Sequence, residues 1–425
     1  MKRLARFGHN SLVAAALSTL AAAAALLVAA TAVEAVELTI MVFDDAKWLA
    51  YHEAAVAEYM QQTPGVNVTV VPGTGDKLRL AVAGGTPVDA FYQAGSSFTA
   101  LAHQGLFLDL EPIIAQDPSL NLDEFFPSAV DAHRYRGVLY GLPQTVSPVL
   151  LLYNRYLFDQ AGAAYPDERW TWRDVVESGR KLTRDLDNDG TIDQYAWSYA
   201  TYSGYNRWPM YVWQNGGDVF SEDGRRLVLD RSEAIEALDF FRDLGRVHRV
   251  APLPNDPILQ RYSYLDLFNH GAAAMVTNTR YYNPPDELDW GLTLVPAGKQ
   301  AATTLITNYY AIVAASQQVP EAWQLIRHLL TVSARRELLR SAHPAVPAFR
   351  ANAVQLIQAE MERLPHEHLW LDAMESARSP YYPPFSEWQS IVNKHFGPWG
   401  NGETSTEAMV HQLVQEASAF LAGLE

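Results

Sequence analysis

The fold is decided by residues 36–73, which read VELTIMVFDDAKWLAYHEAAVAEYMQQTPGVNVTVVPG. An apolar run from Val36 to Phe43 predicts a strand, and the segment from Ala46 to Gln61 predicts a helix. After Pro64-Gly65, alternating valines from Val66 to Val70 predict a second strand. Because strand and helix continue to alternate at this interval, we expect an α/β fold with mostly parallel sheets flanked by helices.

The ends of these strands are the first candidate ligand site. Ligands of parallel sheets bind beyond the carboxyl ends of the strands. In the N-terminal half, those ends are the stretch from Phe43 to Asp45 and the stretch from Tyr92 to Ser97.

The N-terminus has the pattern of a secretory signal. Three basic residues lie among the first six, and an apolar run from Leu12 to Ala30 ends near the small residue Ala35. A membrane anchor is the alternative, but alanine dominates the run and drives insertion weakly. We therefore expect residues 1–35 to be a signal peptide and the protein to lie in the periplasm.

Composition excludes several classes. The apolar content of 48% with 19% charge is globular, and the chain has no cysteine, so neither a disulfide nor a lipid-modified N-terminal cysteine can form. The formal net charge of -16 disfavours nucleic acid and anionic membranes as partners. The 11 tryptophans and 21 tyrosines suit ring-shaped, hydroxyl-rich ligands.

Three segments predict crossings between two halves of the chain. Val138 to Pro148 holds two prolines and a glycine between apolar strands, Pro296 to Gly298 separates two strand-like stretches, and the chain breaks again from His343 to Pro347.

Two helix starts have capping-box spacing. Thr171 precedes Asp174 by three residues, and Thr404 precedes Glu407 by three residues, so we expect Thr171 and Thr404 to be N-cap residues.

A series of short motifs occurs in a fixed order over nearly all of the chain after the signal. In chain order they are Gly141-Leu142-Pro143, Tyr153-Asn154-Arg155, Leu157-Phe158, Ala161-Gly162, Trp170 to Asp174, Lys181-Leu182-Thr183, Trp213 with Asn215 to Gly217, Gly271 to Met275, and Ala322-Trp323 with Ile326. This order resembles the family 1 extracellular solute-binding proteins of ABC importers, the maltose-binding-protein-like family.

The resemblance implies the two-lobed type II periplasmic-binding-protein fold, with three crossover segments at the hinge. It places residues 36–142 and 297–342 in the N-lobe, and residues 143–296 and 343–425 in the C-lobe. It implies a monomer that captures a carbohydrate in the interlobe cleft, delivers it to the permease subunits of an ABC transporter, and catalyses nothing.

Two alternatives stay open. The same fold binds non-sugar solutes such as polyamines or phosphate esters in other families. A secreted glycoside hydrolase would need two carboxylates that flank a bond, but the neighbours Asp44 and Asp45 point apart on an extended chain.

Position in the family pattern selects the candidate ligand-binding residues. They are Asp45, Gln93, Ser96, Tyr205, Trp208, Arg280, Tyr281, Tyr309 and Trp388. Asp45 and Ser96 have a second interpretation as helix caps, and Trp208 and Trp388 have one as core residues. Tyr309 stands where family members commonly have glycine, so it could fill part of the cleft and favour a small ligand, or pack in a loop.

An acidic loop has the carboxylate spacing of a calcium site. The carboxylates are Asp185, Asp187, Asp189 and Asp193, with Gly190 at the sixth position. Ala196 stands where a bidentate glutamate is expected, so the interpretations are a structural calcium ion or an Asx-rich turn.

Overall fold

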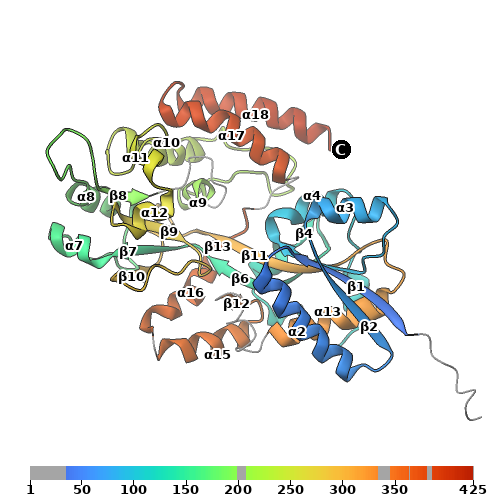
Figure 1. The fold of residues 1–425 in the computed structure, drawn as a ribbon. Coiled ribbons are helices and arrows are strands. Elements are labelled where there is room, and N and C mark those ends of the chain that lie inside the picture. The colour runs from blue at the N-terminus through green and yellow to red at the C-terminus, as the bar shows by residue number, and fades with distance from the viewer. Residues whose placement is uncertain (1–34, 199–206, 334–344, 363, 381–384, 425) are drawn as a thin grey trace, which may run out of the picture.

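The computed structural model describes residues 35–198, 207–333, 345–362, 364–380 and 385–424. These residues form two lobes side by side, each built around its own sheet (Figure 1). The predicted signal peptide lies outside the described residues, apart from Ala35 at its end, and so does Tyr205. Within the described residues, no helix has the length and apolar character needed to cross a membrane.

The first lobe contains the larger sheet, with strand order β12-β6-β11-β3-β1-β2 and β13 paired to β11. Its strands are β1 (Val36–Phe43), β2 (Val66–Gly73), β3 (Ala90–Ala94), β6 (Leu142–Pro148), β11 (Thr303–Ile312), β12 (Val346–Pro347) and β13 (Ala377–Arg378). The helical segments in this part of the chain are α2 (Ala46–Gln62), α3 (Gly75–Ala83), η1 (Gly95–Ser97), α4 (Phe98–His103), α5 (Glu111–Ile114), η2 (Leu122–Glu124), α6 (Pro127–Asp131) and α13 (Val319–Ser333). A small hairpin consists of β4 (Arg134–Tyr135) and β5 (Val138–Leu139).

The second lobe contains a four-stranded sheet with the order β10-β7-β9-β8. Its strands are β7 (Leu150–Asn154), β8 (Tyr195–Ser198), β9 (Ala273–Asn278) and β10 (Trp290–Thr293). Its helices are α7 (Arg155–Ala161), α8 (Trp172–Leu182), α9 (Trp208–Gln214), α10 (Ser232–Arg246), α11 (Ile258–Arg261), α12 (Tyr264–Asn269), α17 (Phe385–Asn401) and α18 (Thr406–Ala422). Between α13 and α17 the chain forms α15 (Arg350–Met361), η3 (Pro365–His368), α16 (Leu369–Asp372) and η4 (Ala373–Glu375).

The predicted opening βαβ unit is confirmed, because β1 pairs in parallel with both β2 and β3. Outside that unit the sheets are mixed, with β13 also parallel to β11. In the first sheet, β11 runs antiparallel to β3 and to β6, and in the second sheet only β8 and β9 are parallel. The strands β6 and β11 connect the two lobes instead of following a crossover helix, so the right-handed parallel geometry of a βαβ unit does not apply to them.

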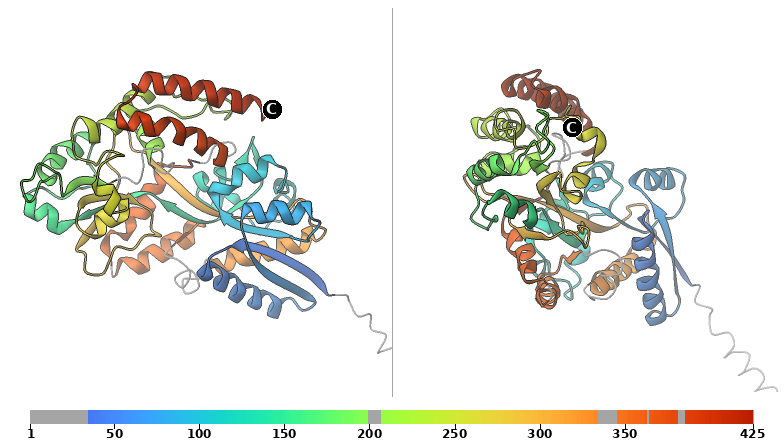
Figure 2. Two further views of the ribbon diagram at one scale, coloured as in Figure 1. Left: turned by 45° about the horizontal axis from the view of Figure 1, so that its top comes forward. Right: turned by 60° about the vertical axis from the view of Figure 1, so that its left-hand side comes forward.

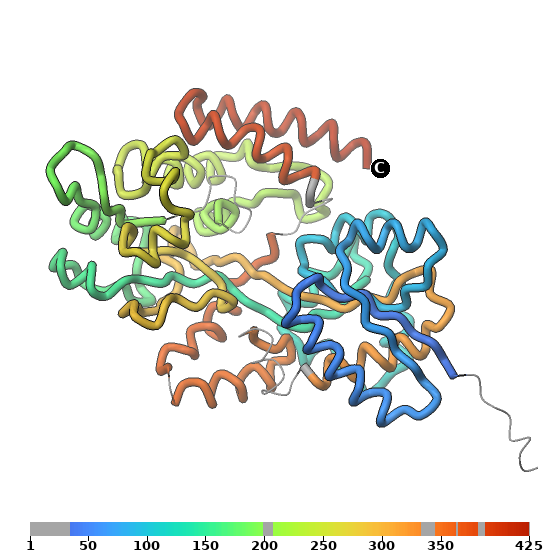
Figure 3. The backbone as a smooth tube through the Cα atoms, in the orientation of Figure 1, coloured from blue at the N-terminus to red at the C-terminus, as the bar shows by residue number. Residues whose placement is uncertain are grey.

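The chain passes between the sheets at the end of the predicted first crossing, Val138 to Pro148. β6 still belongs to the first sheet, and Val149 alone separates it from β7 of the second sheet. Residues 143–148, assigned to the C-lobe from the sequence, therefore pair with the N-lobe sheet, as do the short strands β12 and β13. Figure 3 shows β6 and β11 passing side by side between the lobes.

The largest apolar cluster begins in the first lobe and continues into the second, where it includes Leu152 and Val276. In the first lobe, Trp48 and Tyr51 of α2 pack against the sheet beside the buried strand residue Ile40. In the second lobe, the core is rich in aromatic residues, with Trp213 and Trp399 fully buried. Apolar packing is thus continuous from one lobe to the other in this conformation.

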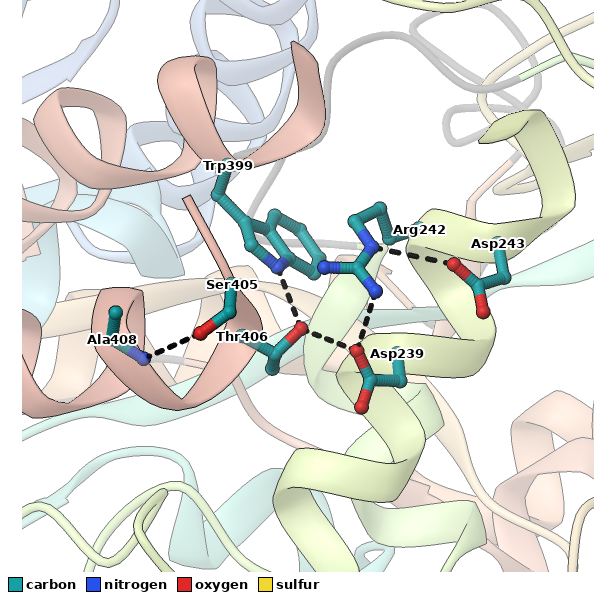
Figure 4. Close-up of polar contacts among 7 residues, drawn as sticks. All are labelled: Asp239, Arg242, Asp243, Trp399, Ser405, Thr406 and Ala408. Carbon is teal, nitrogen blue, oxygen red and sulfur yellow. Dashed lines mark hydrogen bonds and ion pairs between the residues drawn. The ribbon is translucent and has the colours of Figure 1, made fainter. Parts of the chain in front are cut away.

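One capping prediction is confirmed and the other is off by one residue. Thr171 and Asp174 form the expected capping box at the start of α8. At the start of α18 the N-cap residue is Ser405, whose hydroxyl accepts a hydrogen bond from the backbone N–H of Ala408, so the assignment to Thr404 was wrong (Figure 4).

The last two helices are fixed to the second lobe by a buried polar contact. Trp399 Nε1 donates to Thr406 Oγ1 at 2.9 Å, and the same hydroxyl donates to Asp239 of α10 (Figure 4). Arg242 pairs with Asp239 at 2.8 Å. Figure 2 shows α17 and α18 as a red pair on the outside of this lobe.

Candidate functional site

The carboxyl end of β9 reaches the strands that join the lobes. The backbone N–H of Arg280 donates to Ser147 Oγ on β6 at 2.9 Å. In the first lobe, η1 follows β3 directly. Helix α17 of the second lobe lies against η1 and α4. Strand ends of both lobes therefore converge around β6 and β11, which is where α/β sheets bind ligands.

Tyr281 links the second lobe to the crossing strands through its side chain. Its hydroxyl lies 3.0 Å from Thr145 Oγ1 and accepts a hydrogen bond from Asn308 Nδ2 at 3.4 Å. Burial raises the pKa of Tyr281 to about 12, so the phenol is neutral at physiological pH. A neutral phenol both donates and accepts hydrogen bonds, as a sugar hydroxyl does.

A buried polar network fixes the partners of Tyr281. Asn308 also donates to the hydroxyl of Tyr92 at 2.9 Å, and Tyr92 donates to Gln144 Oε1 at 2.8 Å. Gln144 in turn donates to the hydroxyl of Tyr51 at 3.2 Å. Because Asn308, Tyr92, Gln144 and Tyr51 are hydrogen-bonded in one chain, the network holds Gln144 of β6 and Asn308 of β11 in one arrangement.

Arg280 is held by a carboxylate that the sequence analysis did not select. Its guanidinium pairs with Glu367 of η3 at 2.7 Å, and the two side chains are only 11% and 7% exposed. A buried ion pair of this kind fixes the direction of the guanidinium. Arg280 is thus a positioned cation next to Tyr281.

The predicted residues of the first lobe lie at its strand ends, with local roles. Asp45 is the N-cap of α2 and accepts hydrogen bonds from the backbone N–H groups of Lys47 and Trp48, which confirms its interpretation as a cap. Gln93 is buried and donates to the carbonyl of Gly73 at 3.3 Å. Ser96 is half-buried in η1 and makes no cap hydrogen bond there.

Two predicted tryptophans lie inside the second lobe. Trp208 is 1% exposed and packs against Phe396, with ring centroids 5.1 Å apart. Trp388 is 3% exposed and packs edge-on against Phe220. Both tryptophans therefore have the core position that was the alternative to ligand contact.

Tyr309 fills core space in the first lobe instead of cleft space. Its side chain is fully buried, with ring centroids 5.2 Å from Phe98 and 5.1 Å from His133. Its hydroxyl lies 3.1 Å from Ser97 Oγ. Because the ring points into this core, its position gives no reason to expect a small ligand.

The strand end of β1 carries Phe43 and Asp44, which lie in the stretch named as a candidate ligand site from the sequence but are not among the selected ligand-binding residues. Phe43 is 38% exposed and offers an apolar ring face at the carboxyl end of the strand. Asp44 is paired with Lys77 of α3 at 3.0 Å. Their position at a strand end was the signal available in the sequence.

The acidic loop brings three of its four predicted carboxylates together. Oxygen atoms of Asp185, Asp187 and Asp193 lie within 4.8 Å of one another, and Asp189 is not part of that group. Asp185 also accepts the backbone N–H of Gly190 at 2.8 Å, as in an Asx-rich turn. Oxygen-only donors fit calcium, which stays a prediction beside the turn interpretation.

A cavity of 1160 Å³ lies at the boundary between the lobes. Its walls come from α4 and the β4–β5 hairpin of the first lobe, and from residues 220–226 and the end of α18 in the second. Of the predicted ligand residues that the structure describes, none lines this cavity.

The fold, with residues of both lobes meeting around β6 and β11, defines a two-lobed α/β binding protein. The profile of the bacterial extracellular solute-binding protein family matches residues 49–335. The chain therefore belongs to that family, which confirms the resemblance inferred from the order of the short motifs.

Among solved structures, three sugar-binding proteins share the fold. An ABC substrate-binding protein of Listeria monocytogenes in complex with cycloalternan has a TM-score of 0.75 at 23% identity, covering 91% of this chain and 99% of that one. The cyclic alpha-maltosyl-1,6-maltose binding protein of Arthrobacter globiformis has a TM-score of 0.76 at 18% identity, with coverage of 91% and 99%. The sugar-binding protein MalE of Xanthomonas citri has a TM-score of 0.76 at 20% identity, with coverage of 91% and 98%.

Among curated relatives, the arabinooligosaccharide-binding protein of Halalkalibacterium halodurans is 29% identical over 163 residues. That match covers 38% of this chain and 34% of the relative, so the chain spans about a third of its length. A putative binding protein of Brucella abortus is 23% identical over 314 residues, covering 71% of this chain and 73% of the relative.

Proposed function

We propose that this protein is the substrate-binding subunit of an ABC-type sugar importer, which captures a carbohydrate between its lobes and delivers it to a membrane permease. The observation that carries the proposal is that the end of β9 meets the strand that crosses to the other lobe. The backbone N–H of Arg280 donates to Ser147, and the hydroxyl of Tyr281 is hydrogen-bonded to Thr145. The names of the relatives, which bind arabinooligosaccharide, cycloalternan and maltosyl sugars, support a carbohydrate ligand.

The chemistry of the site suits a sugar. The neutral phenol of Tyr281 and the fixed guanidinium of Arg280 are hydrogen-bonding groups of the kind that sugar hydroxyls need. The half-buried Ser96 and the exposed ring of Phe43 lie at strand ends of the first lobe, where a ring face suits the C–H side of a sugar. Hydroxyls that lose water on binding need such partners.

The proposal includes export through a cleaved signal peptide, a monomeric state and no catalysis. The carboxylates of Asp44 and Asp45 are engaged with Lys77 and with the N-terminus of α2, so this pair is not arranged as the acid and base of a glycoside hydrolase.

The test is to incubate the purified protein with labelled neutral oligosaccharides and to separate bound from free sugar. We expect the recovered sugar to be chemically unchanged and to stay with the protein. Release of shorter products would show a hydrolase, and retention of a polyamine but of no sugar would show the non-sugar alternative.

A further inference from the structure

Two hairpin tips, one from each lobe, face the 1160 Å³ cavity. The first tip is Arg136-Gly137, which joins β4 to β5, and the second is the loop from Ser221 to Arg226. The carboxyl end of α18 forms a third wall. Pockets for small ligands commonly have volumes of roughly 300 to 1,000 Å³, so this cavity has room for several sugar rings.

The lining of the cavity is locally basic, although the chain as a whole is acidic. Its charged side chains are Arg134, Arg136, Arg225 and Arg226 against Glu222 and Asp223. Arg134 is paired with Glu111 at 2.6 Å, which leaves three arginines against two carboxylates in this cavity of a protein whose formal net charge is -16. A local surplus of guanidinium groups inside a concave surface attracts anionic ligands.

The first tip holds an arginine in a backbone conformation that arginine rarely adopts. Arg136 has a φ of 51° and Gly137 has a φ of 84°. A two-residue hairpin turn with positive φ at both positions strongly favours Asn-Gly or Gly-Gly, so a long side chain at the first position is unusual. The guanidinium of Arg136 donates to the carbonyl of Leu424 at 3.1 Å, and this contact holds it across the lobe boundary.

The second tip is fixed by hydrogen bonds within the loop. The backbone N–H of Ser221 donates to the carbonyl of Arg226 at 2.8 Å, and Ser221 Oγ accepts the N–H of Arg226 at 3.0 Å. The carboxylate of Asp223 accepts hydrogen bonds from Ser221 Oγ and from the N–H of Arg225, which lower the pKa of Asp223. Asp223 therefore serves the shape of the loop that presents Arg225 and Arg226.

We propose that this cavity binds the carboxylate-bearing rings of an acidic oligosaccharide, such as a chain of uronic acids, with guanidinium groups of both lobes pairing with its carboxylates. Guanidinium groups bind carboxylates through two parallel hydrogen bonds, which lysine cannot do. This inference rests on the proposed function, because it assigns a sugar class to a sugar-binding protein.

The test is calorimetric titration of the protein with trigalacturonate and, in parallel, with maltotriose. The variant is the double substitution Arg136→Ala with Arg226→Ala. The matched control is Arg169→Ala with Arg173→Ala, which removes two exposed arginines of the second lobe and changes the net charge equally. Thermal melting of each variant checks that the fold is retained.

We expect the cavity variant to bind trigalacturonate at least tenfold more weakly than the original protein does. The control variant should bind trigalacturonate as the original protein does, and both variants should have the same affinity for maltotriose. Equal trigalacturonate affinity in the two variants would overturn the assignment, as would displacement of trigalacturonate by inorganic phosphate at a similar concentration. Binding of maltotriose without trigalacturonate would refute this inference alone, whereas binding of neither these sugars nor other oligosaccharides would refute the proposed function.

Discussion

The hydroxyl of Tyr281 lies 3.0 Å from Oγ1 of Thr145. Tyr281 follows β9 of the second sheet, and Thr145 lies on β6 of the first sheet. This contact crosses from one lobe to the strand that leads to the other. A ligand bound beside it would touch groups that belong to both sheets.

Tyr281→Phe tests the role of this hydroxyl. We expect sugar binding to weaken about tenfold, because a lost hydrogen bond in a buried site costs about 1 to 2 kcal/mol. The matched control is Tyr282→Phe. Among the described residues, the hydroxyl of Tyr282 donates to Asn269 of the same lobe and not to a strand that crosses between the lobes. Calorimetric titration measures both. Equal affinities in the two variants would show that the cleft lies elsewhere.

Glu367→Ala tests the buried ion pair with Arg280. The substitution removes a close carboxylate from a guanidinium that is only 11% exposed, so we expect a loss of about 3 to 5 kcal/mol in the free energy of unfolding. Urea unfolding followed by tryptophan fluorescence measures it. Asp167→Ala removes the partner of the exposed Arg169 and serves as the control, for which we expect no measurable change. A stability loss that is the same in both variants would contradict the burial of the pair.

Two buried histidines make the first lobe sensitive to acid. His52 bonds through Nδ1 to the carbonyl of Trp48 and through Nε2 to the hydroxyl of Tyr310, and His133 bonds through Nδ1 to the carbonyl of Ala129. Burial lowers the pKa of each histidine from 6.5 to about 4.

Between pH 6.5 and about 4, the unfolded chain protonates both histidines while the folded chain keeps them neutral. Stability from these groups is therefore fully present above pH 6.5 and is lost as the pH falls, by about 1.4 kcal/mol per pH unit for each histidine. Urea unfolding at pH 7, 6 and 5 measures the slope. His52→Gln removes one of the two titrating groups, so it should reduce the slope of stability against pH by about 1.4 kcal/mol per pH unit. A variant with the same slope as the original protein would contradict this account.

Calcium binding to the acidic loop is tested by metal removal. Carboxylates of Asp185, Asp187 and Asp193 within 4.8 Å repel one another without a cation, so we expect millimolar calcium to raise the Tm of chelator-treated protein. Asp187→Asn should remove the increase, whereas Asp223→Asn in a different loop should keep it. An identical Tm with and without calcium would leave the Asx-rich turn as the correct interpretation.

Local features of the fold could be predicted from the sequence because they depend on neighbouring residues. The strand from Val36, the helix from Ala46 and the capping box of Thr171 and Asp174 all occur where the pattern placed them. The pairing direction of β6 and β11 depends on how the chain crosses between lobes, which local patterns do not encode.

The site could be predicted only in part for the same reason. Arg280 and Tyr281 were selected from their position after a strand, and their contact with a ligand stays a prediction. The partner of Arg280 is 87 residues away in the sequence. The sequence does not distinguish an aromatic residue in a core from one in a cleft. The burial of Trp388 and Tyr309 therefore became visible only with the tertiary structure.

Small-angle X-ray scattering of the protein with and without a saturating sugar tests the central claim most directly. If the ligand is held by groups of both lobes, binding favours the closed arrangement, and hinge closure makes the protein more compact. We predict a smaller radius of gyration in the bound state, with Tyr281→Phe needing more sugar to reach it. A protein that binds the sugar with an unchanged scattering curve would contradict the account.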